Sequence, residues 1–412
     1  MKNGFRVLFG GIVAVCAVTL AVVGYWREAL PDSYSVGQGE TLTVNQWIGE
    51  VSPGEVSPWE ESRPAVAKAA AATRQTCLRL WGAVAVKTVA VTEVEKPTVT
   101  VCGSPFGVKL YTDGVLVVGL GPVSTPAGTV SPGEEAGLRV GDTILTVDGT
   151  AVSTNRRLGE LVSSSGGKPL SLRVGRDGVA FNATLTPVAG TGEGRSGYFA
   201  GLWVRDSSAG VGILTFYDRA TGMAAGLGHS ITDADTRQKM SVSGGEIVPA
   251  GIFSVTKSTV GTPGELCGTF LPGSVATLDA NLDSGLYGHL KQMPTGETMP
   301  LALSQEVHTG KAEILTTLSG VTPKRYSVTV ERVRGGGTRN MVIRVTDAEL
   351  LRSAGGIVQG MSGSPIIQDG KLIGAVTHVL VNDPTRGYAI FAETMLEAAQ
   401  SVAGENKLKD AS

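Results

Sequence analysis

The sequence predicts a mainly β protein made of several domains. Its 412 residues exceed what one small domain needs and suffice for two or three folded units with cores of their own. Valine-rich stretches of alternating apolar and polar residues recur along the chain, and most of the 57 glycines fall between them, which is typical of short strands joined by tight turns. The formal net charge of -2 excludes recruitment of nucleic acid or acidic lipid by a global basic field.

Residues 1–25 predict a transmembrane anchor. The run Val7 to Tyr25 has 19 residues without a charge and follows Lys2 and Arg6, so the basic end is expected in the cytoplasm and the remainder outside. A cleaved signal peptide is the competing interpretation. The apolar region of a signal peptide is usually shorter, however, and ends at an A-x-A-like site that is not obvious here.

Residues 26–100 are expected to form a stalk and then a small β-rich segment. Pro, Glu, Gly and Ser dominate up to about residue 65, as in VSPGEVSPWEESRP, so no core is expected there. Three cysteines, Cys77, Cys102 and Cys267, would lie outside the membrane, and their spacing matches no metal site or redox pair. A disulfide between Cys77 and Cys102 stays open, although small buried thiols are favoured.

Residues 101–190 predict a compact module of strands with two helices. The stretch SPFGVKLYTDGVLVVGL predicts two strands around Asp113-Gly114, and NRRLGELVSSSG predicts a helix with an apolar side. Together with Ala136-Gly137-Leu138 and Val147-Asp148-Gly149, these motifs resemble a PDZ domain.

The PDZ resemblance implies a groove between a sheet edge and a helix, where an extended peptide adds as a strand. Phe106, Gly107 and Val108 match the loop that offers backbone N–H groups to a peptide carboxylate in PDZ domains. The alternative is that these residues only close a compact barrel and the groove is unused.

Residues 191–405 predict a second β domain, with enough short strands for two packed barrels. Its most informative stretch is GGIVQGMSGSPIIQDG, in which Gly360 and Gly363 flank Ser362. Glycines permit the tight turn on which a serine hydroxyl is exposed as a nucleophile. Ser364 is the alternative nucleophile, and Pro365 beside it makes Ser362 the better candidate.

A serine nucleophile needs a base, and the chain has four histidines. His229 stands among glycines and small residues in AAGLGHSITDADT and is the best candidate, because its ordinary pKa lets it exchange a proton near neutrality. His378, sixteen positions after Ser362, is the rival, although it is expected to line or buttress the substrate pocket. His289 and His308 lie in segments without comparable context.

The stretches GLGHSITDADT, GGEIVPAGIFSV, MVIRVTDAELL and GGIVQGMSGSPIIQDGKLIGAVTHV together resemble the SpoIVB peptidase family. The resemblance implies a chymotrypsin-like double β-barrel peptidase, with Ser362 as nucleophile, His229 as base and Asp347 as third triad member. Asp233 and Asp235 stay open as alternatives to Asp347. The GMSG turn is similar to that of chymotrypsin-like proteases, which implies an oxyanion hole made by the N–H groups of Gly360 and Ser362.

The resemblance further implies a membrane-anchored, self-cleaving serine endopeptidase that needs no cofactor or metal. Its catalytic part would lie in the forespore intermembrane space and would cut a membrane-bound regulator, so that a late sigma factor is processed. Self-cleavage could release that part from the membrane. The PDZ module would bind a peptide terminus of this chain or of a partner. Two alternatives stay open, namely a PDZ scaffold with an inactive protease-like domain and a general cell-envelope serine protease.

Overall fold

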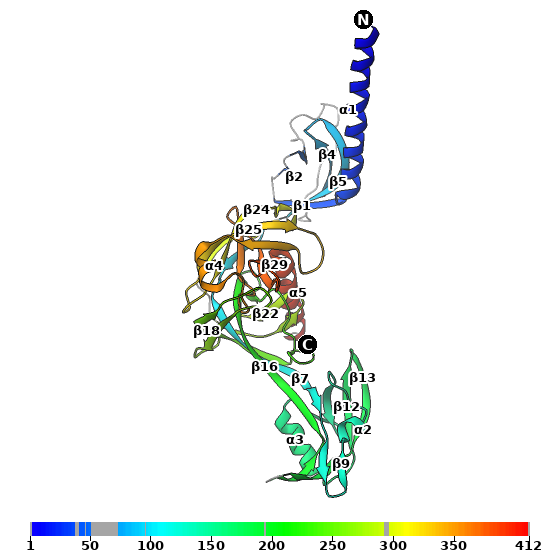
Figure 1. Cartoon of the computed structure of the whole chain (residues 1–412), viewed down its shortest axis with the longest axis vertical. Helices are drawn as coiled ribbons and strands as arrows, with labels where there is room; N and C mark the ends of the chain where they lie inside the picture. Colours follow the sequence, from blue (N-terminus) through cyan, green and yellow to red (C-terminus); the bar gives the residue numbers. More distant parts are fainter. Residues whose placement is uncertain are drawn as a thin grey trace. The chain divides into compact units, whose positions relative to one another are not determined.

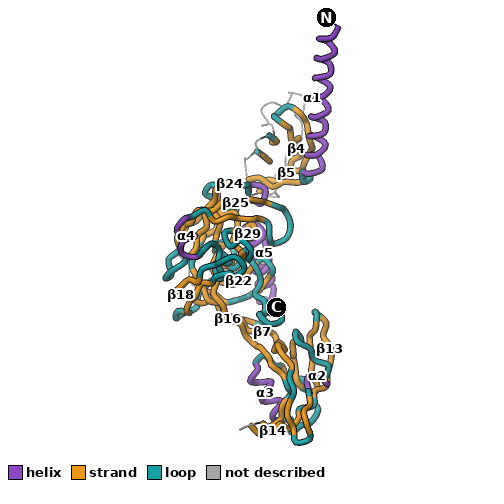
Figure 2. The backbone as a smooth tube through the Cα atoms, viewed as in Figure 1, coloured by secondary structure: helices purple, strands orange, loops and turns teal. Residues whose placement is uncertain are grey.

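The computed structural model describes residues 2–37, 41–45, 47–50, 73–94, 96–192, 195–291 and 296–410. These residues form two compact units: Met1–Pro97 with Pro300–His308, and Thr98–Met299 with Thr309–Ser412. Strands predominate in the second unit, whereas the first combines one long helix with a small sheet (Figure 2). The expectation of a mainly β protein is thus confirmed.

The first unit holds one long helix, α1 (Lys2–Ala29), and a five-stranded sheet in the order β1-β5-β4-β3-β2. Its strands are β1 (Ser33–Gly37), β2 (Thr43–Asn45), β3 (Ile48–Glu50), β4 (Thr73–Leu80) and β5 (Val84–Val94), and the short 3-10 helix η2 (Ser304–Glu306) belongs to the same unit. Tyr34, Val36 and Ile48 are buried against Leu78 and Val91. The described part of the predicted stalk is therefore folded into this sheet, while residues 51–72 lie outside the described residues.

Helix α1 covers the predicted anchor Val7–Tyr25 (Figure 1). The side chains of residues 1–15 lie outside those that the structure describes. Within the described residues, no helix has both the length and the apolar character needed to cross a bilayer. The anchor therefore stays a prediction.

The second unit begins with a half-barrel whose sheet runs β7-β16-β17-β22-β21, with β18 on the other edge of β7 and β6 pairing β16. The strands are β6 (Thr98–Val101), β7 (Pro105–Leu120), β16 (Leu202–Asp218), β17 (Met223–Gly226), β18 (Gly244–Thr256), β19 (Glu265–Phe270), β20 (Ala276–Thr277), β21 (Ala280–Leu282), β22 (Gly285–His289) and β23 (Glu297–Pro300). Its core gathers Phe106, Val108 and Leu110 of β7 with Leu214 of β16 and Ile247 of β18.

The far halves of β7 and β16 carry the PDZ module, so the module is inserted into the half-barrel. The other strands of its sheet follow in the order β13-β12-β10-β7. Its elements are β8 (Val123–Thr125), β9 (Gly128–Val130), α2 (Pro132–Glu135), β10 (Thr143–Val147), β11 (Thr150–Ala151), α3 (Asn155–Ser164), β12 (Leu170–Arg176), β13 (Val179–Leu185), β14 (Val188–Gly192) and β15 (Arg195–Phe199). Asp177 and Gly178 both have positive φ (50° and 79°), as the two-residue hairpin turn between β12 and β13 requires.

This insertion corrects the role expected for Phe106, Gly107 and Val108. All three lie in β7 and pair on one side with β16 and on the other with β18. Their backbone groups are therefore committed to the sheet and are not available to a peptide carboxylate. Phe106 and Val108 are buried in the half-barrel core, so residues 98–111 belong to the half-barrel and not to the PDZ-like module that is expected to start at residue 101.

The second half of the region 191–405 is a closed barrel in the order β24-β25-β26-β29-β28-β27. Figure 1 labels β24, β25 and β29 of this barrel. Its strands are β24 (Gly310–Thr316), β25 (Lys324–Val333), β26 (Met341–Val345), β27 (Pro365–Gln368), β28 (Lys371–Val379) and β29 (Arg386–Phe391). Two helices flank the last strands in sequence, namely α4 (Ala348–Ala354) and α5 (Ala392–Asp410). The small and apolar residues of the segment 365–391 supply much of the barrel core.

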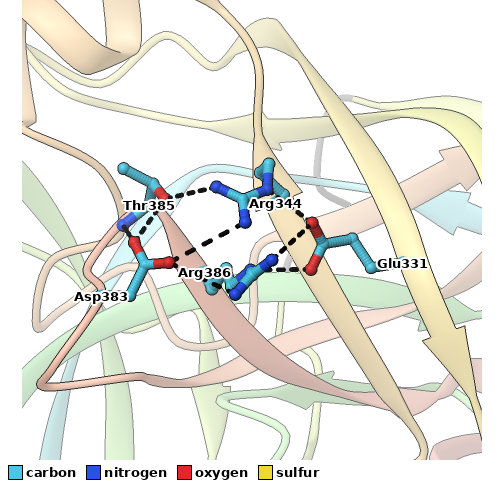
Figure 3. Close-up of polar contacts among 5 residues, drawn as sticks. All are labelled: Glu331, Arg344, Asp383, Thr385 and Arg386. Atoms are coloured by element: carbon cyan, nitrogen blue, oxygen red, sulfur yellow. Dashed lines mark hydrogen bonds and ion pairs between the residues drawn. The ribbon is translucent and has the colours of Figure 1, made fainter.

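An ion-pair network fixes the loop before β29 (Figure 3). Glu331 of β25 pairs with Arg344 of β26 and with Arg386 of β29, the latter at 2.8 Å. Arg344 donates to the Thr385 hydroxyl at 3.2 Å, and that hydroxyl donates to Asp383 at 2.6 Å. The network thus joins three barrel strands to the loop that begins after β28.

All four cysteines are free thiols. Cys102 is buried in the half-barrel core, and burial raises the pKa of its thiol to about 12. Cys77 and Cys102 are not joined by a disulfide, and of the three cysteines expected as buried thiols Cys102 is buried, whereas Cys77 and Cys267 are only partly buried.

Candidate active site

A cleft of about 860 Å³ is lined by residues from both halves of the peptidase region. The half-barrel contributes Leu227, His229 and Ile231, which follow β17, and the closed barrel contributes Ser362 and His378. The structure therefore brings the predicted nucleophile and the predicted base to one cleft, although they are far apart in sequence.

The turn that carries Ser362 depends on its two glycines. Gly360 and Gly363 have φ values of 89° and 90°, in the left-handed region that favours glycine. A Cβ on Gly363 would lie 2.0 Å from the Ile213 carbonyl oxygen, so a side chain cannot fit there. The Ser362 carbonyl accepts the N–H of Ile213 at 2.9 Å, which fixes the turn against β16.

The Ser362 hydroxyl donates to the carbonyl of Thr377 at 2.7 Å. The backbone N–H groups of Gly360 and Ser362 make no hydrogen bond with any described residue. Gln359 pairs with the start of β19, because its N–H donates to Gly264 and its carbonyl accepts from Leu266. Since C=O and N–H point to opposite sides of a trans peptide, this pairing directs the Gly360 N–H away from β19.

The His229 ring is half-buried, and its Nδ1 lies 2.8 Å from the Ser230 carbonyl oxygen. A carbonyl can only accept, so we assign the proton to Nδ1 and the free lone pair to Nε2. Burial lowers the pKa of His229, the Ser230 carbonyl opposes this, and the Arg339 charge lowers the pKa further. The imidazole is therefore neutral near pH 7, which is the form that a general base requires.

His378 lies beside His229, with ring centroids 4.7 Å apart and planes tilted by 38°. Burial, followed by the charges of His229 and Arg339, lowers the pKa of His378 to about 4. His378 follows Thr377, whose carbonyl holds the Ser362 hydroxyl, so it lines the cleft as the sequence suggests.

The structure does not bring Asp347 to His229. Asp347 caps helix α4, where its carboxylate accepts the N–H groups of Glu349 and Leu350 at 2.9 and 3.0 Å. Burial would raise the pKa of Asp347, but hydrogen bonds from Leu350, Ser327 and Glu349 outweigh it, so the pKa is lowered. Asp347 does not line the cleft.

The alternative acids and the alternative nucleophile also form contacts outside the cleft. Asp233 is buried and pairs with Arg205, and Asp235 pairs with the same arginine at 2.7 Å. Ser364 is buried, and its hydroxyl donates to the carbonyl of Met361 at 2.6 Å. None of the three lines the cleft.

Sequence reasoning missed two backbone groups of the site, the carbonyls of Ser230 and Thr377. Every residue carries a carbonyl, so no residue type marks these positions. It also missed Arg339, which lines the cleft from the loop between β25 and β26 and lies 5.2 Å over the Tyr388 ring. Its only sequence signal is a run of glycines before it.

A second groove, of about 630 Å³, lies on the PDZ module. Leu158 and Val162 of α3 line one side, and the segment 198–204 lines the other. Thr154 caps α3, because its side chain accepts the N–H of Arg157, and this fixes the start of the helix.

Residues 196–396 match the family SpoIVB peptidase S55, and residues 123–176 match the PDZ domain family. The chain is 29% identical over 182 residues to the Regulator of sigma-E protease RseP of Salmonella typhimurium, which covers 39% of this chain and 40% of that protein. A Regulator of sigma E protease of Salmonella typhi matches with the same values. The chain thus spans about 40% of the length of these curated relatives.

Two solved structures are similar over part of the chain. The active form of the Rv3671c protease from M. tuberculosis has a TM-score of 0.29 and 15% identity, covering 48% of this chain and 75% of that chain. The HtrA-type protease AlgW with a decapeptide has a TM-score of 0.26 and 16% identity, covering 48% of this chain and 54% of that chain.

The family matches make this chain a serine peptidase that also carries a PDZ domain. The region 196–396 matches the SpoIVB peptidase S55 family, the family whose motifs the sequence resembles.

Proposed function

We propose that the chain is a membrane-anchored, self-cleaving serine endopeptidase that cuts a membrane-bound regulator in the sporulation pathway leading to sigma factor processing. The observation that carries the catalytic part is the cleft shared by Ser362 and His229, beside two N–H groups of the nucleophile turn that no described residue accepts. The family name supports the sporulation role. The curated relatives named as regulators of sigma-E protease are consistent with a role in sigma factor control.

In the proposed reaction, the Ser362 oxygen attacks the carbonyl carbon of the substrate and Nε2 of His229 takes its proton. The hydroxyl hydrogen must first turn from the Thr377 carbonyl towards the imidazole, a rotation that is open to a serine hydroxyl. The C–N bond then breaks, and His229 passes the proton to the leaving amine. Water hydrolyses the acyl-enzyme in the second half of the reaction.

The remaining roles follow from the geometry around that pair. The N–H groups of Gly360 and Ser362 would bind the oxyanion, and one such donor is commonly worth about 2.7–4 kcal/mol in the transition state. The Ser230 carbonyl would hold the imidazole in the required tautomer, in place of Asp347. We place the PDZ peptide site in the groove beside α3, where a peptide terminus of this chain or of a partner would bind.

Substitution of the nucleophile tests the proposal. Ser362→Ala should abolish self-cleavage of the purified full chain and hydrolysis of peptide substrates, with an unchanged circular dichroism spectrum. His229→Ala should match it, whereas His378→Ala should retain activity. Continued processing by folded Ser362→Ala would place the nucleophile elsewhere, and no activity in the wild-type chain would favour a scaffold with an inactive peptidase domain.

A further inference from the structure

Of the charged side chains that line the cleft, the acidic one has an ion-pair partner and the basic ones have none among the residues that the structure describes. They are Arg237, Arg339 and Asp283. Asp283 is neutralised by Lys239 at 3.0 Å. Neither arginine forms an ion pair with a carboxylate within the described part of the chain. The cleft therefore offers a net positive charge to whatever binds there.

Of the two arginines, Arg339 is the one whose charge acts on the histidines of the cleft. Its charge lowers the pKa of both His229 and His378, which an arginine distant from the two rings would not do. Its guanidinium lies over the Tyr388 ring at 5.2 Å, and such stacking limits the orientations of the side chain. A stacked guanidinium that lacks a carboxylate partner is suited to take one from a ligand in bidentate fashion.

The wall beside the nucleophile turn has a different character. Ile357 and Val358 precede the turn and are buried, and Val379 and Val381 line the cleft beyond the Thr377 carbonyl. A substrate carbonyl bound by the N–H groups of Gly360 and Ser362 would place the adjoining side chain between these two segments. The segments present aliphatic groups and no acid or base.

We propose that Arg339 binds a carboxylate side chain of the peptide substrate, so that the cleft selects an acidic residue near an aliphatic residue at the cut. This rests on the proposed function, and it adds the substrate class to it. A carboxylate on Arg339 would also cancel the charge that opposes protonation of His229, at the moment when the imidazole must accept a proton.

The test uses the purified full chain and quenched fluorescent peptides with valine at the cut. A single Glu is placed in turn at each of the three positions before and after the valine, with Gln in the matched peptides. At one or more positions the wild type should prefer Glu by about tenfold in kcat/KM, mainly through KM, since hydrogen bonds to charged groups contribute about 1.5–3 kcal/mol.

Variants assign that preference to one side chain. Arg339→Gln should remove it, Arg339→Glu should transfer it to the matched Lys peptide, and the control Arg334→Gln, on the same loop but outside the cleft, should leave it unchanged. Equal rates for Glu and Gln peptides at every position in the wild type, or a preference that survives Arg339→Gln, would overturn the proposal.

A binding measurement separates this proposal from the catalytic assignment. Fluorescence anisotropy with the Ser362→Ala chain should show about tenfold tighter binding of the Glu peptide, and addition of Arg339→Gln should abolish the difference. Equal affinities would contradict the role of Arg339 whatever the activity of the wild type. Hydrolysis that is equal in wild type and Ser362→Ala would instead contradict the proposed nucleophile.

Discussion

The histidine that we propose as base is oriented by a backbone carbonyl. The Ser230 oxygen lies 2.8 Å from Nδ1 of His229. In a serine peptidase triad this position belongs to a carboxylate, which also stabilises the imidazolium by its charge. A neutral carbonyl fixes the tautomer equally well but supplies only a dipole, so the site is expected to depend more on Gly360 and Ser362 for electrostatic stabilisation.

Removal of the helix cap tests whether Asp347 has a catalytic role. Asp347→Ala should lower the free energy of unfolding by about 1 kcal/mol, because two N–H groups of α4 lose their acceptor. The folded enzyme should keep kcat close to the wild-type value. Urea denaturation and peptide hydrolysis measure the two effects separately. A loss of about ten-thousandfold in kcat without unfolding would instead restore Asp347 as the third triad member.

The pH dependence of the reaction should depend on the positive charge of Arg339. Burial is the largest cause of the lowered pKa of His229, and the Arg339 charge lowers this pKa further because it opposes protonation. Arg339→Gln should raise the pKa of His229 and move the acid limb of kcat/KM to higher pH, measured on a peptide without acidic residues. Arg339→Lys keeps the charge and should keep the limb in place. If the acid limb of kcat/KM in Arg339→Gln lies at the same pH as in the wild type, the Arg339 charge does not affect the pKa of His229.

The common cleft of Ser362 and His229 was predictable because each sits in a glycine-rich local motif, and the backbone freedom of glycine can be recognised in a sequence. The groups that complete the site were not predictable. The Ser230 and Thr377 carbonyls have no residue signature, and Arg339 reaches the cleft only through the closure of the barrel.

At the scale of elements, the start of β19 holds the nucleophile turn in place. Gly264 and Leu266 pair with Gln359, and the buried Ser258, between β18 and β19, links the same segments. Its hydroxyl donates to the Ile357 carbonyl at 2.9 Å and accepts the Gly264 N–H at 2.7 Å. The proposed oxyanion hole thus depends on a hairpin from the other half of the peptidase region.

Ser258→Ala should therefore reduce turnover without touching the catalytic pair. The change leaves the Ile357 carbonyl and the Gly264 N–H without a partner, at a cost of about 1–3 kcal/mol. If part of that cost appears as a displaced Gly360 N–H, kcat should fall by about tenfold with little change in KM. Ser243→Ala, which removes an exposed hydroxyl bound to the Tyr111 carbonyl, is the matched control. Equal kcat values in the two variants would contradict the role of the hairpin.

The elements also show where sequence patterns are ambiguous. The stretch 105–120 predicts two strands around Asp113-Gly114, but the structure has one strand, β7, in which Gly114 has a φ of 84°. The two halves of this strand pack in different cores, the half-barrel and the PDZ module. Periodicity alone cannot show that one strand serves two cores, which is why Phe106 was assigned to the wrong module.

For the whole molecule, the insertion of the PDZ module into the half-barrel determines which residues can be deleted without unfolding the half-barrel. Deletion of residues 101–190 would remove Phe106, Val108 and Leu110 from the half-barrel core. Each buried side chain of this size contributes about 1.5–3 kcal/mol, against a typical total stability of about 5–15 kcal/mol. That deletion should therefore yield an unfolded peptidase region.

Deletion of residues 113–205 should instead leave the half-barrel intact. Tyr111 pairs with Ser207, and the Thr112 hydroxyl donates to the Asp206 carbonyl at 3.1 Å, so a short Asn-Gly turn can join the two strands. The shortened chain should show one cooperative thermal transition and should hydrolyse short peptides, while losing binding at the PDZ groove. A folded product from the first deletion and an aggregated product from the second would contradict this insertion.

The insertion also sets an order of events during translation. The ribosome completes β7 long before its partner β16, because the PDZ residues are synthesised between the two strands. Nascent chains fold largely from the N-terminus, so the PDZ module can form while the half-barrel still lacks one of its central strands. Ser362 emerges later still. The polypeptide therefore holds no complete cleft until the PDZ module, β16 and the segment around Ser362 have all left the ribosome.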